Sequence, residues 1–136
     1  MLKKIFLIFC AVLISWTGLY YTYAKEKNID TCRDFLASYN WEVDITPTDK
    51  AEVTIPAVFD KVYENYNNIQ KKAGLDLSSY RGKSGTRYTF AVKNYPYPVN
   101  ETVYANVILI DGKAVAGDIM TVSLSGFMHA LSENHP

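Results

Sequence analysis

The sequence contains few of the residues from which catalytic and metal-binding sites are usually built. Only 2 of its 136 residues are His and only 2 are Cys, and no spacing among them resembles a zinc site. There is no Gly-x-Ser-x-Gly nucleophile elbow and no calcium-binding loop. Gly82-Lys83-Ser84 has the form of the end of a phosphate-binding loop, but Leu77 stands where the first Gly of that loop belongs. We therefore expect no metal, no cofactor and no enzymatic activity.

Net charge is lacking as well. The 14 Lys and Arg residues are balanced by 14 Asp and Glu residues, so the formal net charge is 0. A neutral chain has no overall field that attracts nucleic acid or anionic lipid, and we expect no nucleic-acid partner. Aromatic residues, in contrast, make up 14% of the chain, and 11 residues are Tyr. This composition is typical of a folded domain and not of a disordered chain.

The two cysteines lie in different kinds of sequence. Cys10 lies within an apolar run, and the bulky Phe9 before it argues against a lipid-modified cysteine, which follows a small residue. Cys32 is the single cysteine that remains if the N-terminal segment is removed, and a lone cysteine cannot form an intramolecular disulfide. We expect the domain to be held together by its core alone, with Cys32 as a small buried apolar residue.

Residues 1–24 have the pattern of a targeting segment. Lys3 and Lys4 are followed by an apolar run from Ile5 to Trp16, and small residues occupy the −3 and −1 positions of a cut after Ala24. A positive start, an apolar run and a small-residue site are together the signature of a secretory signal peptide.

An uncleaved membrane anchor is the alternative. Residues 5–23 approach the ~20 residues that a helix needs to span a bilayer, and their last tyrosines suit a membrane interface. Contact with a membrane would then be made through residues 5–23 only. Both alternatives put residues 25–136 outside the cytoplasm, either at the outer face of the cytoplasmic membrane or secreted after cleavage. We expect residues 25–29 to be a spacer and residues 30–136 to form a single extracytoplasmic domain.

Two helices are predicted in this domain. The first is capped by Asp30 and ends at Asn40, which can take a left-handed turn. The second begins at Pro56, ends at Gly74, and has a buried face marked by residues such as Val58, Val62 and Tyr66.

The remaining segments are predicted to be strands. Alternating apolar and polar residues indicate strands over 41–45, 51–55 and 86–95. Asp111-Gly112 between two apolar runs, 103–110 and 113–124, is typical of a type I′ hairpin.

Counting outward from the hairpin turn pairs Ile108 with Val115, Asn106 with Gly117, and Ala105 with Asp118. A last helical turn is expected over residues 127–131. The fold class is therefore α+β, with two helices packed on an antiparallel sheet that ends in a β-meander, preceded by an N-terminal hydrophobic helix.

Asp118 is the most unusual polar residue of the predicted sheet. The counted register places it on the same face as Val107 and Ala116, where a carboxylate needs partners. It can mark a binding site, but we favour a structural role in which it accepts bonds from backbone amides at a bulge beside Gly117. His129, in a short apolar segment, is likewise more typical of a structural histidine than of a catalytic one, and His135 lies next to the C-terminus.

The segment from Asn94 to Asn100 is the second candidate site. Tyr95 and Tyr97 alternate there with two prolines, which makes a stiff aromatic loop. Exposed tyrosines on a rigid backbone suit recognition of a protein or a glycan. The alternative is that these tyrosines cover the end of the sheet. Tyr95, Tyr97 and Asp118 are thus the candidate binding residues.

Several short segments carry a resemblance to a known kind of family. They include Phe35-Leu36, Trp41-Glu42-Val43, Ile55-Pro56, Tyr80-Arg81-Gly82-Lys83, Gly117-Asp118 and Gly126-Phe127-Met128. Over residues 30–131 the chain resembles an uncharacterised domain-of-unknown-function family of short exported or membrane-anchored proteins from Gram-positive anaerobic bacteria. The resemblance implies an exported bacterial protein, and it implies no catalytic residues.

We therefore expect a non-enzymatic exported or membrane-tethered module that binds a protein or a cell-envelope component. The alternative is an inhibitor or regulator of an extracellular protease or envelope enzyme. Fold class alone does not decide between these functions.

Overall fold

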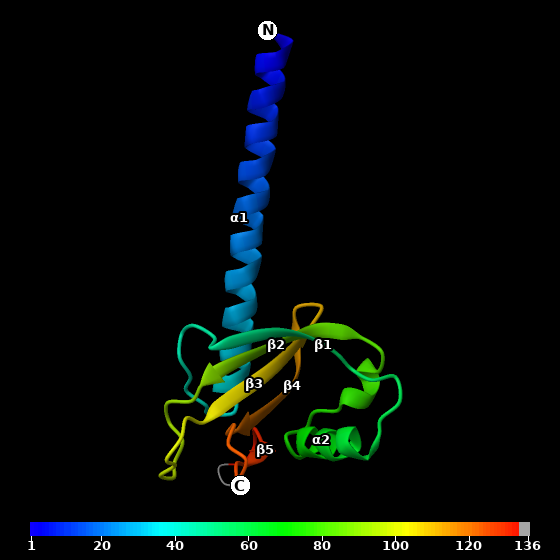
Figure 1. The fold of residues 1–136 in the computed structure, drawn as a ribbon, viewed down its shortest axis with the longest axis vertical. Coiled ribbons are helices and arrows are strands. Elements are labelled where there is room, and N and C mark those ends of the chain that lie inside the picture. The colour runs from blue at the N-terminus through cyan, green and yellow to red at the C-terminus, as the bar shows by residue number, and fades with distance from the viewer. Residues whose placement is uncertain (134–136) are drawn as a thin grey trace.

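The computed structural model describes residues 1–133 and has the predicted α+β fold (Figure 1). Its elements are α1 (Leu2–Ala37), β1 (Asp49–Thr54), α2 (Lys61–Lys72), the 3₁₀ helix η1 (Leu77–Tyr80), β2 (Ser84–Ala91), β3 (Tyr104–Ile110), β4 (Lys113–Met120) and β5 (Met128–Ala130). The five strands are antiparallel and lie in the order β1-β2-β3-β4-β5, which confirms the meander. The segment predicted as a last helical turn is instead the edge strand β5.

Helix α1 is continuous from the apolar N-terminus into the domain, so the prediction that Asp30 caps a separate helix is wrong. Residues 25–29 contain no Gly or Pro, and nothing in them interrupts the helix. The predicted end is confirmed, because Asn40 has a φ of 66° and the Trp41 N–H donates to the Leu36 carbonyl at 3.1 Å. This left-handed turn sends the chain away from the helix axis immediately before Trp41.

Helix α2 begins later than predicted, and its buried side includes Tyr66 of the predicted face but not Val58 or Val62. Pro56 does not start it; the Asp60 carboxylate caps it by accepting from the Tyr63 N–H at 2.8 Å. Val58 and Val62 are 80% and 76% exposed, whereas Asn67 and Gln70 are buried.

Two backbone amides explain this orientation of α2. The Leu77 N–H donates to Asn67 Oδ1 and the Gly117 N–H donates to Gln70 Oε1, each at 2.8 Å. Without these side chains both buried donors would be unpaired, at a cost of about 1–3 kcal/mol each.

The segment 41–45 is not the strand that its alternation predicts. It makes a single bridge between Val43 and Val92, and Ile45 is 74% exposed. The strand predicted over residues 51–55 is confirmed and corresponds to β1. It pairs with β2 on the same edge as the Val43–Val92 bridge.

The β3–β4 hairpin has the predicted turn but a different register. Asp111 and Gly112 have φ values of 51° and 74°, as a type I′ turn requires. After the first two pairs the register shifts by one, because Val115 is an extra residue in β4.

The predicted pairs beyond that bulge are therefore wrong. Ile108 faces Ala116, Asn106 faces Asp118 and Ala105 faces Ile119. Asp118 consequently shares a face with Asn106 and not with Val107.

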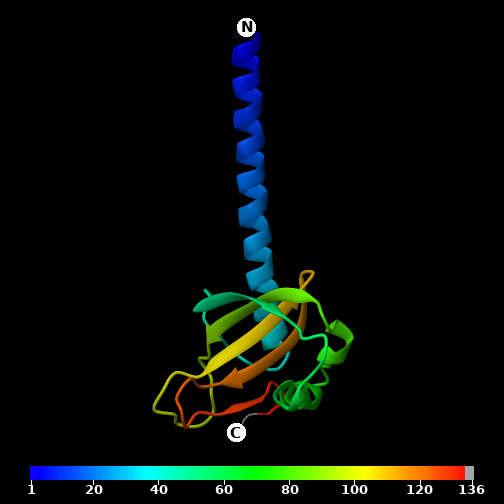
Figure 2. The ribbon, with the colours of Figure 1, turned by 45° about the vertical axis from the view of Figure 1, so that its right-hand side comes forward.

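The sheet has helices on both faces (Figure 2). The end of α1 packs on one face, in a core that includes Cys32, Leu36, Tyr88, Phe90 and Val107. We call this the α1 face. Helix α2 and η1 cover part of the other face, the α2 face, in a second core that includes Ile55, Leu77 and Ile108.

Candidate functional site

A row of polar side chains crosses the α2 face of the sheet. The register puts Thr89 of β2 opposite Asn106 of β3, and Asn106 opposite Asp118 of β4. The Thr89 hydroxyl donates to Asn106 Oδ1 at 2.6 Å, and Asn106 Nδ2 donates to Asp118 Oδ1 at 2.9 Å. From α2, the Tyr66 hydroxyl donates to Asp118 Oδ2 at 3.0 Å. We call Tyr66, Asp118, Asn106 and Thr89 the polar row.

The polar row is almost closed to solvent. Asp118 is 1% exposed, and Asn106 and Thr89 are buried as well. Burial raises the pKa of Asp118, and the hydrogen bonds from Asn106 and Tyr66 and the charge of Arg87 oppose that rise. Burial and the neighbouring Asp118 also raise the pKa of Tyr66 well above its ordinary value. The expected bonds from backbone amides to Asp118 are replaced by bonds from two side chains.

A second group of side chains forms an aromatic cluster at the end of the α1 face. It consists of Trp41, Tyr95, Phe127 and His129. Tyr95 stacks between Trp41 and Phe127, with ring centroids 6.0 and 5.5 Å away, and Phe127 stacks on His129 at 5.5 Å. Centroid distances in this range are typical of favourable aromatic contacts.

Histidine 129 is held at both ring nitrogens. Its Nδ1 lies 2.9 Å from the Ala130 carbonyl, and its Nε2 lies 3.2 Å from the Tyr95 hydroxyl. A carbonyl oxygen only accepts, so Nδ1 carries a proton, and in the neutral ring Nε2 accepts from Tyr95. His129 is 3% exposed. Its surroundings agree with the structural role favoured from the sequence, and His135 lies outside the described residues.

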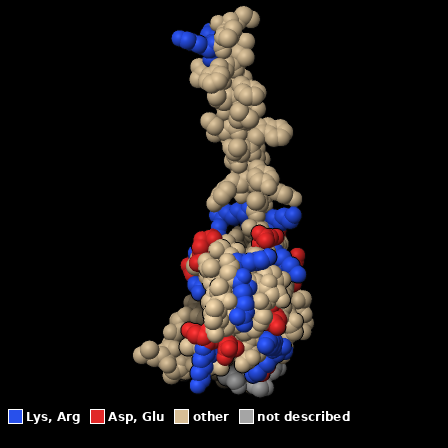
Figure 3. All heavy atoms as spheres, turned by 90° about the vertical axis from the view of Figure 1, so that its right-hand side faces the viewer, with Lys and Arg blue, Asp and Glu red and all other residues tan. Residues whose placement is uncertain are grey.

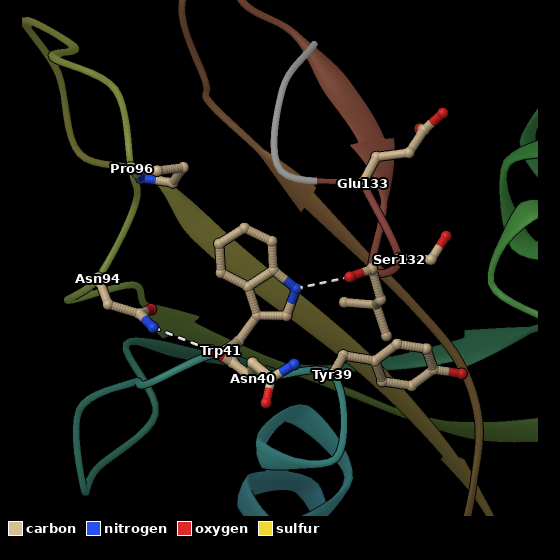
Figure 4. Close-up of a pocket in the computed structure, with 8 residues that line it drawn as sticks. Tyr39, Asn40, Trp41, Asn94, Pro96, Ser132 and Glu133 are labelled. Carbon is tan, nitrogen blue, oxygen red and sulfur yellow. Dashed lines mark hydrogen bonds between the residues drawn. The ribbon is translucent and has the colours of Figure 1, made fainter.

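A pocket of 360 Å³ lies beside this aromatic cluster (Figure 4). We call it the distal pocket. It is lined by residues 39–41 after α1, by Asn94 and Pro96 after β2, and by residues 131–133 after β5. Trp41 Nε1 donates to the Leu131 carbonyl at 2.8 Å, which fixes the indole at the pocket wall. Asn94 joins the loop to the end of α1, since its Nδ2 donates to the Asn40 carbonyl at 2.8 Å.

The predicted site residues are not brought together. Asp118 lies on the α2 face, whereas Tyr95 belongs to the aromatic cluster, whose His129 is paired with Ile119 on the α1 face. Tyr95 and Tyr97, both in the segment of residues 94–100 that we call the tyrosine loop, also differ. Tyr95 is half-buried and contacts four rings, one of them that of Tyr97, whereas Tyr97 contacts Tyr95 and is 50% exposed at the loop tip.

Sequence reasoning missed the partners of these residues. Asn106 carried a signal, because a polar residue in the middle of an apolar strand needs a polar neighbour. Asn94 gave no such signal, since its bond to the Asn40 carbonyl depends on the left-handed turn at Asn40. Among residues 1–133, no three His, Cys, Asp or Glu side chains are grouped so that they could hold a metal ion.

Comparison with known proteins identifies the family. Residues 35–119 match the domain of unknown function DUF4830, and the chain belongs to that family. No curated protein and no solved structure gives a significant match. The matched region begins in the last turn of α1 and ends at Ile119, so it contains the polar row, Trp41, Asn94 and the tyrosine loop.

Proposed function

We propose that this member of the DUF4830 family is a module tethered to the outer face of a membrane, where it binds a protein or a cell-envelope component. In this proposal α1 is the anchor, and the module has no enzymatic activity of its own. The observation that carries the proposal is the part of α1 that projects from the domain with apolar side chains exposed all around it (Figure 1).

The projecting part of α1 has the properties of a membrane span. By length and composition α1 is suited to cross a bilayer, and no residue of its apolar stretch is buried. Phe6, Ile14 and Trp16 are among the large side chains it exposes. A helix that is apolar on all sides is normally enclosed by protein or by lipid. Lipid is therefore the surrounding that we infer for residues 5–23.

The ends of this segment support one orientation. Lys3 and Lys4 precede it, and basic residues on a short flank favour the cytoplasmic side. Tyr20, Tyr21 and Tyr23 are exposed at its other end, where aromatic residues suit the headgroup layer. Figure 3 shows the apolar helix between basic residues at its tip and the mixed charges of the domain surface.

The distal pocket and the tyrosine loop support a binding role. Both lie at the end of the molecule opposite the N-terminus, and are thus directed away from the inferred membrane (Figure 1). Tyr97 offers an exposed aromatic side chain whose loop is held by Tyr95 and Asn94. Rigid aromatic side chains bind partners at low cost in conformational entropy.

The burial of the residues best suited to acid–base chemistry supports the proposal of a non-enzymatic module. Asp118 and His129 are both buried, and each is hydrogen-bonded to a tyrosine hydroxyl. A catalytic acid or base needs to reach the proton that it transfers.

Cell fractionation with intact-mass measurement tests the tether. We expect the full-length mass, from Met1 to Pro136, in the membrane fraction after washing with alkaline carbonate. The mass of residues 25–136 in the medium would show cleavage after Ala24 and a released protein.

Site-specific crosslinking tests the binding surface. A photoreactive phenylalanine analogue at position 97 is expected to give a discrete adduct in intact cells. The same analogue at position 58 is the matched control, since Val58 is also exposed but belongs to the α2 side of the domain. Adducts at 58 alone, or at neither position, would contradict binding through the tyrosine loop.

A further inference from the structure

The α2 face of the sheet is only partly covered by α2, and a groove of 220 Å³ lies on the remaining part. It crosses four strands: Asp49 of β1, Arg87 and Thr89 of β2, Asn106 of β3 and Met120 of β4 are among its lining residues. Two members of the polar row, Thr89 and Asn106, are part of this lining, and both are buried. The floor is therefore a fixed polar surface, held by the bonds of the polar row.

Arg87 is the cation of this groove, and its bonding is incomplete. Its Nη2 lies 3.4 Å from Asp49 Oδ2, at the long limit of a hydrogen bond, and both side chains are partly exposed. Its Nε is buried, and no atom of residues 1–133 accepts a hydrogen bond from it. Because that Nε is closed to solvent, a ligand in the groove reaches the guanidinium from its exposed end, where the contact with Asp49 is long. A carboxylate placed there accepts from two N–H groups in the two-bond geometry that guanidinium favours.

The rest of the lining limits the kind of anion. Asp49 at the rim repels a second negative charge, which disfavours a dianion such as a phosphate ester. Tyr104, Met120 and Val122 give the groove an apolar wall. A short hydrocarbon chain would bury its surface there.

We propose that the groove beside Arg87 binds a small monocarboxylate with a short apolar chain. The carboxylate lies on Arg87 above the Thr89–Asn106 floor, and the chain lies along Tyr104, Met120 and Val122. This site is separate from the distal pocket and does not depend on the membrane tether, so each proposal can fail without the other.

Methyl NMR of the methionines tests this site on the full chain in lipid nanodiscs. The 3 methionines are Met1, Met120 and Met128. With hexanoate as the probe, we expect a saturable shift of the Met120 methyl resonance and none at Met1, which lies at the opposite end of the molecule. Hexanamide is the uncharged control, and we expect it to bind at least about tenfold more weakly, because it lacks the charged bond to Arg87.

Two variants separate the roles of the charges. Arg87→Gln is expected to weaken hexanoate binding about tenfold or more, to the level of hexanamide. Asp49→Asn removes the competing partner of Arg87 and one repelling charge, and is expected to tighten hexanoate binding several-fold. Equal shifts with hexanoate and hexanamide, or no saturable Met120 shift, would overturn the proposal. Weaker binding in Asp49→Asn would overturn it even if Arg87→Gln failed to fold.

Discussion

The two faces of the sheet are covered by helices in different ways. On the α1 face, the contacts are made mostly by apolar side chains such as Leu36 and Phe90. On the α2 face, the buried residues of the covering helix are the polar Asn67 and Gln70, and Tyr66 bonds to a buried carboxyl group. One helix is thus placed by shape and apolar area, and the other largely by hydrogen bonds of defined direction.

This difference has a consequence for specificity. Apolar packing tolerates volume-conserving exchange, because the hydrophobic effect has no direction. A buried polar row has no such tolerance, since each donor left without an acceptor loses its hydration without compensation. We therefore expect the α2 face to be the more sensitive to single polar changes, although less apolar surface covers it.

The largest effect is expected when the centre of the polar row is removed. Asp118→Ala leaves the Tyr66 hydroxyl and Asn106 Nδ2 without their acceptor, and should lower the free energy of unfolding by about 2–5 kcal/mol. Trp41 fluorescence in urea measures this, with Trp16→Phe as the common background.

Asp118→Asn is the matched control for this change. Its oxygen can accept from Tyr66, and the Asn106 amide can turn over so that it accepts from the new amide group and donates to the Thr89 hydroxyl. We expect a loss under about 1.5 kcal/mol. Equal losses in both variants would show that hydrogen-bond direction does not hold the row together.

A smaller effect is expected at Gly117, where neighbouring atoms on the α1 face leave no room for a side chain. A Cβ atom on Gly117 would lie 2.7 Å from Leu131 Cδ1, 2.8 Å from the Asn106 carbonyl oxygen and 3.3 Å from Phe35 Cε1. Gly117→Ala should therefore lower the free energy of unfolding by about 1–3 kcal/mol, as overpacking does. Gly18→Ala is the control, since no atom lies within 4 Å of its Cβ position, and it should leave the domain unchanged in the same urea titration.

The same contrast explains how far the fold could be predicted from the sequence. Strands β1 to β4, the Asp111-Gly112 turn and the left-handed Asn40 follow from local patterns and were predictable. The segment 41–45 and the edge strand β5 were not, since the first makes only one bridge and the second was expected to be helical. The face of α2 was not, because Val58 and Val62 suggested an apolar face, and the bonds of Asn67 and Gln70 are made to distant backbone amides.

The site was predictable to a smaller extent. Asp118 could be recognised as a buried polar residue, but its neighbours depend on a one-residue bulge at Val115. A bulge of this kind changes which residues face each other without leaving a clear pattern in the sequence.

The pH dependence of stability tests the polar row without removing its bonds. The pKa of Asp118 is raised by burial, so the native state keeps this proton to higher pH than the unfolded state does. Its contribution to the free energy of unfolding is fully present below the unfolded pKa of about 3.9 and decreases as pH rises through the folded value, by at most ~1.36 kcal/mol per pH unit.

The difference in the free energy of unfolding between wild type and Asp118→Asn, measured as a function of pH, isolates the contribution of Asp118. Glu133, whose pKa is lowered by its bond from Lys72, has the opposite pH dependence, and it cancels in the difference. We expect the stability of the wild type relative to Asp118→Asn to fall as pH rises above about 4. A rise over that range would mean that Asp118 is stabilised as an anion by Arg87 and its donors.

The smallest effect is expected in the tyrosine loop, which contains one of the few polar contacts on the α1 face. Tyr95→Phe removes the hydroxyl that bonds His129 but keeps the stacked ring, and should cost about 0.5–1.5 kcal/mol. Tyr97→Phe is its matched control, since Tyr97 is exposed at the loop tip, and the change should stay within about 0.5 kcal/mol. Both values come from the same urea titrations. If Tyr97→Phe cost as much as Tyr95→Phe, the loop tip would belong to the packed structure, and Tyr97 would be a poor candidate for contact with a partner.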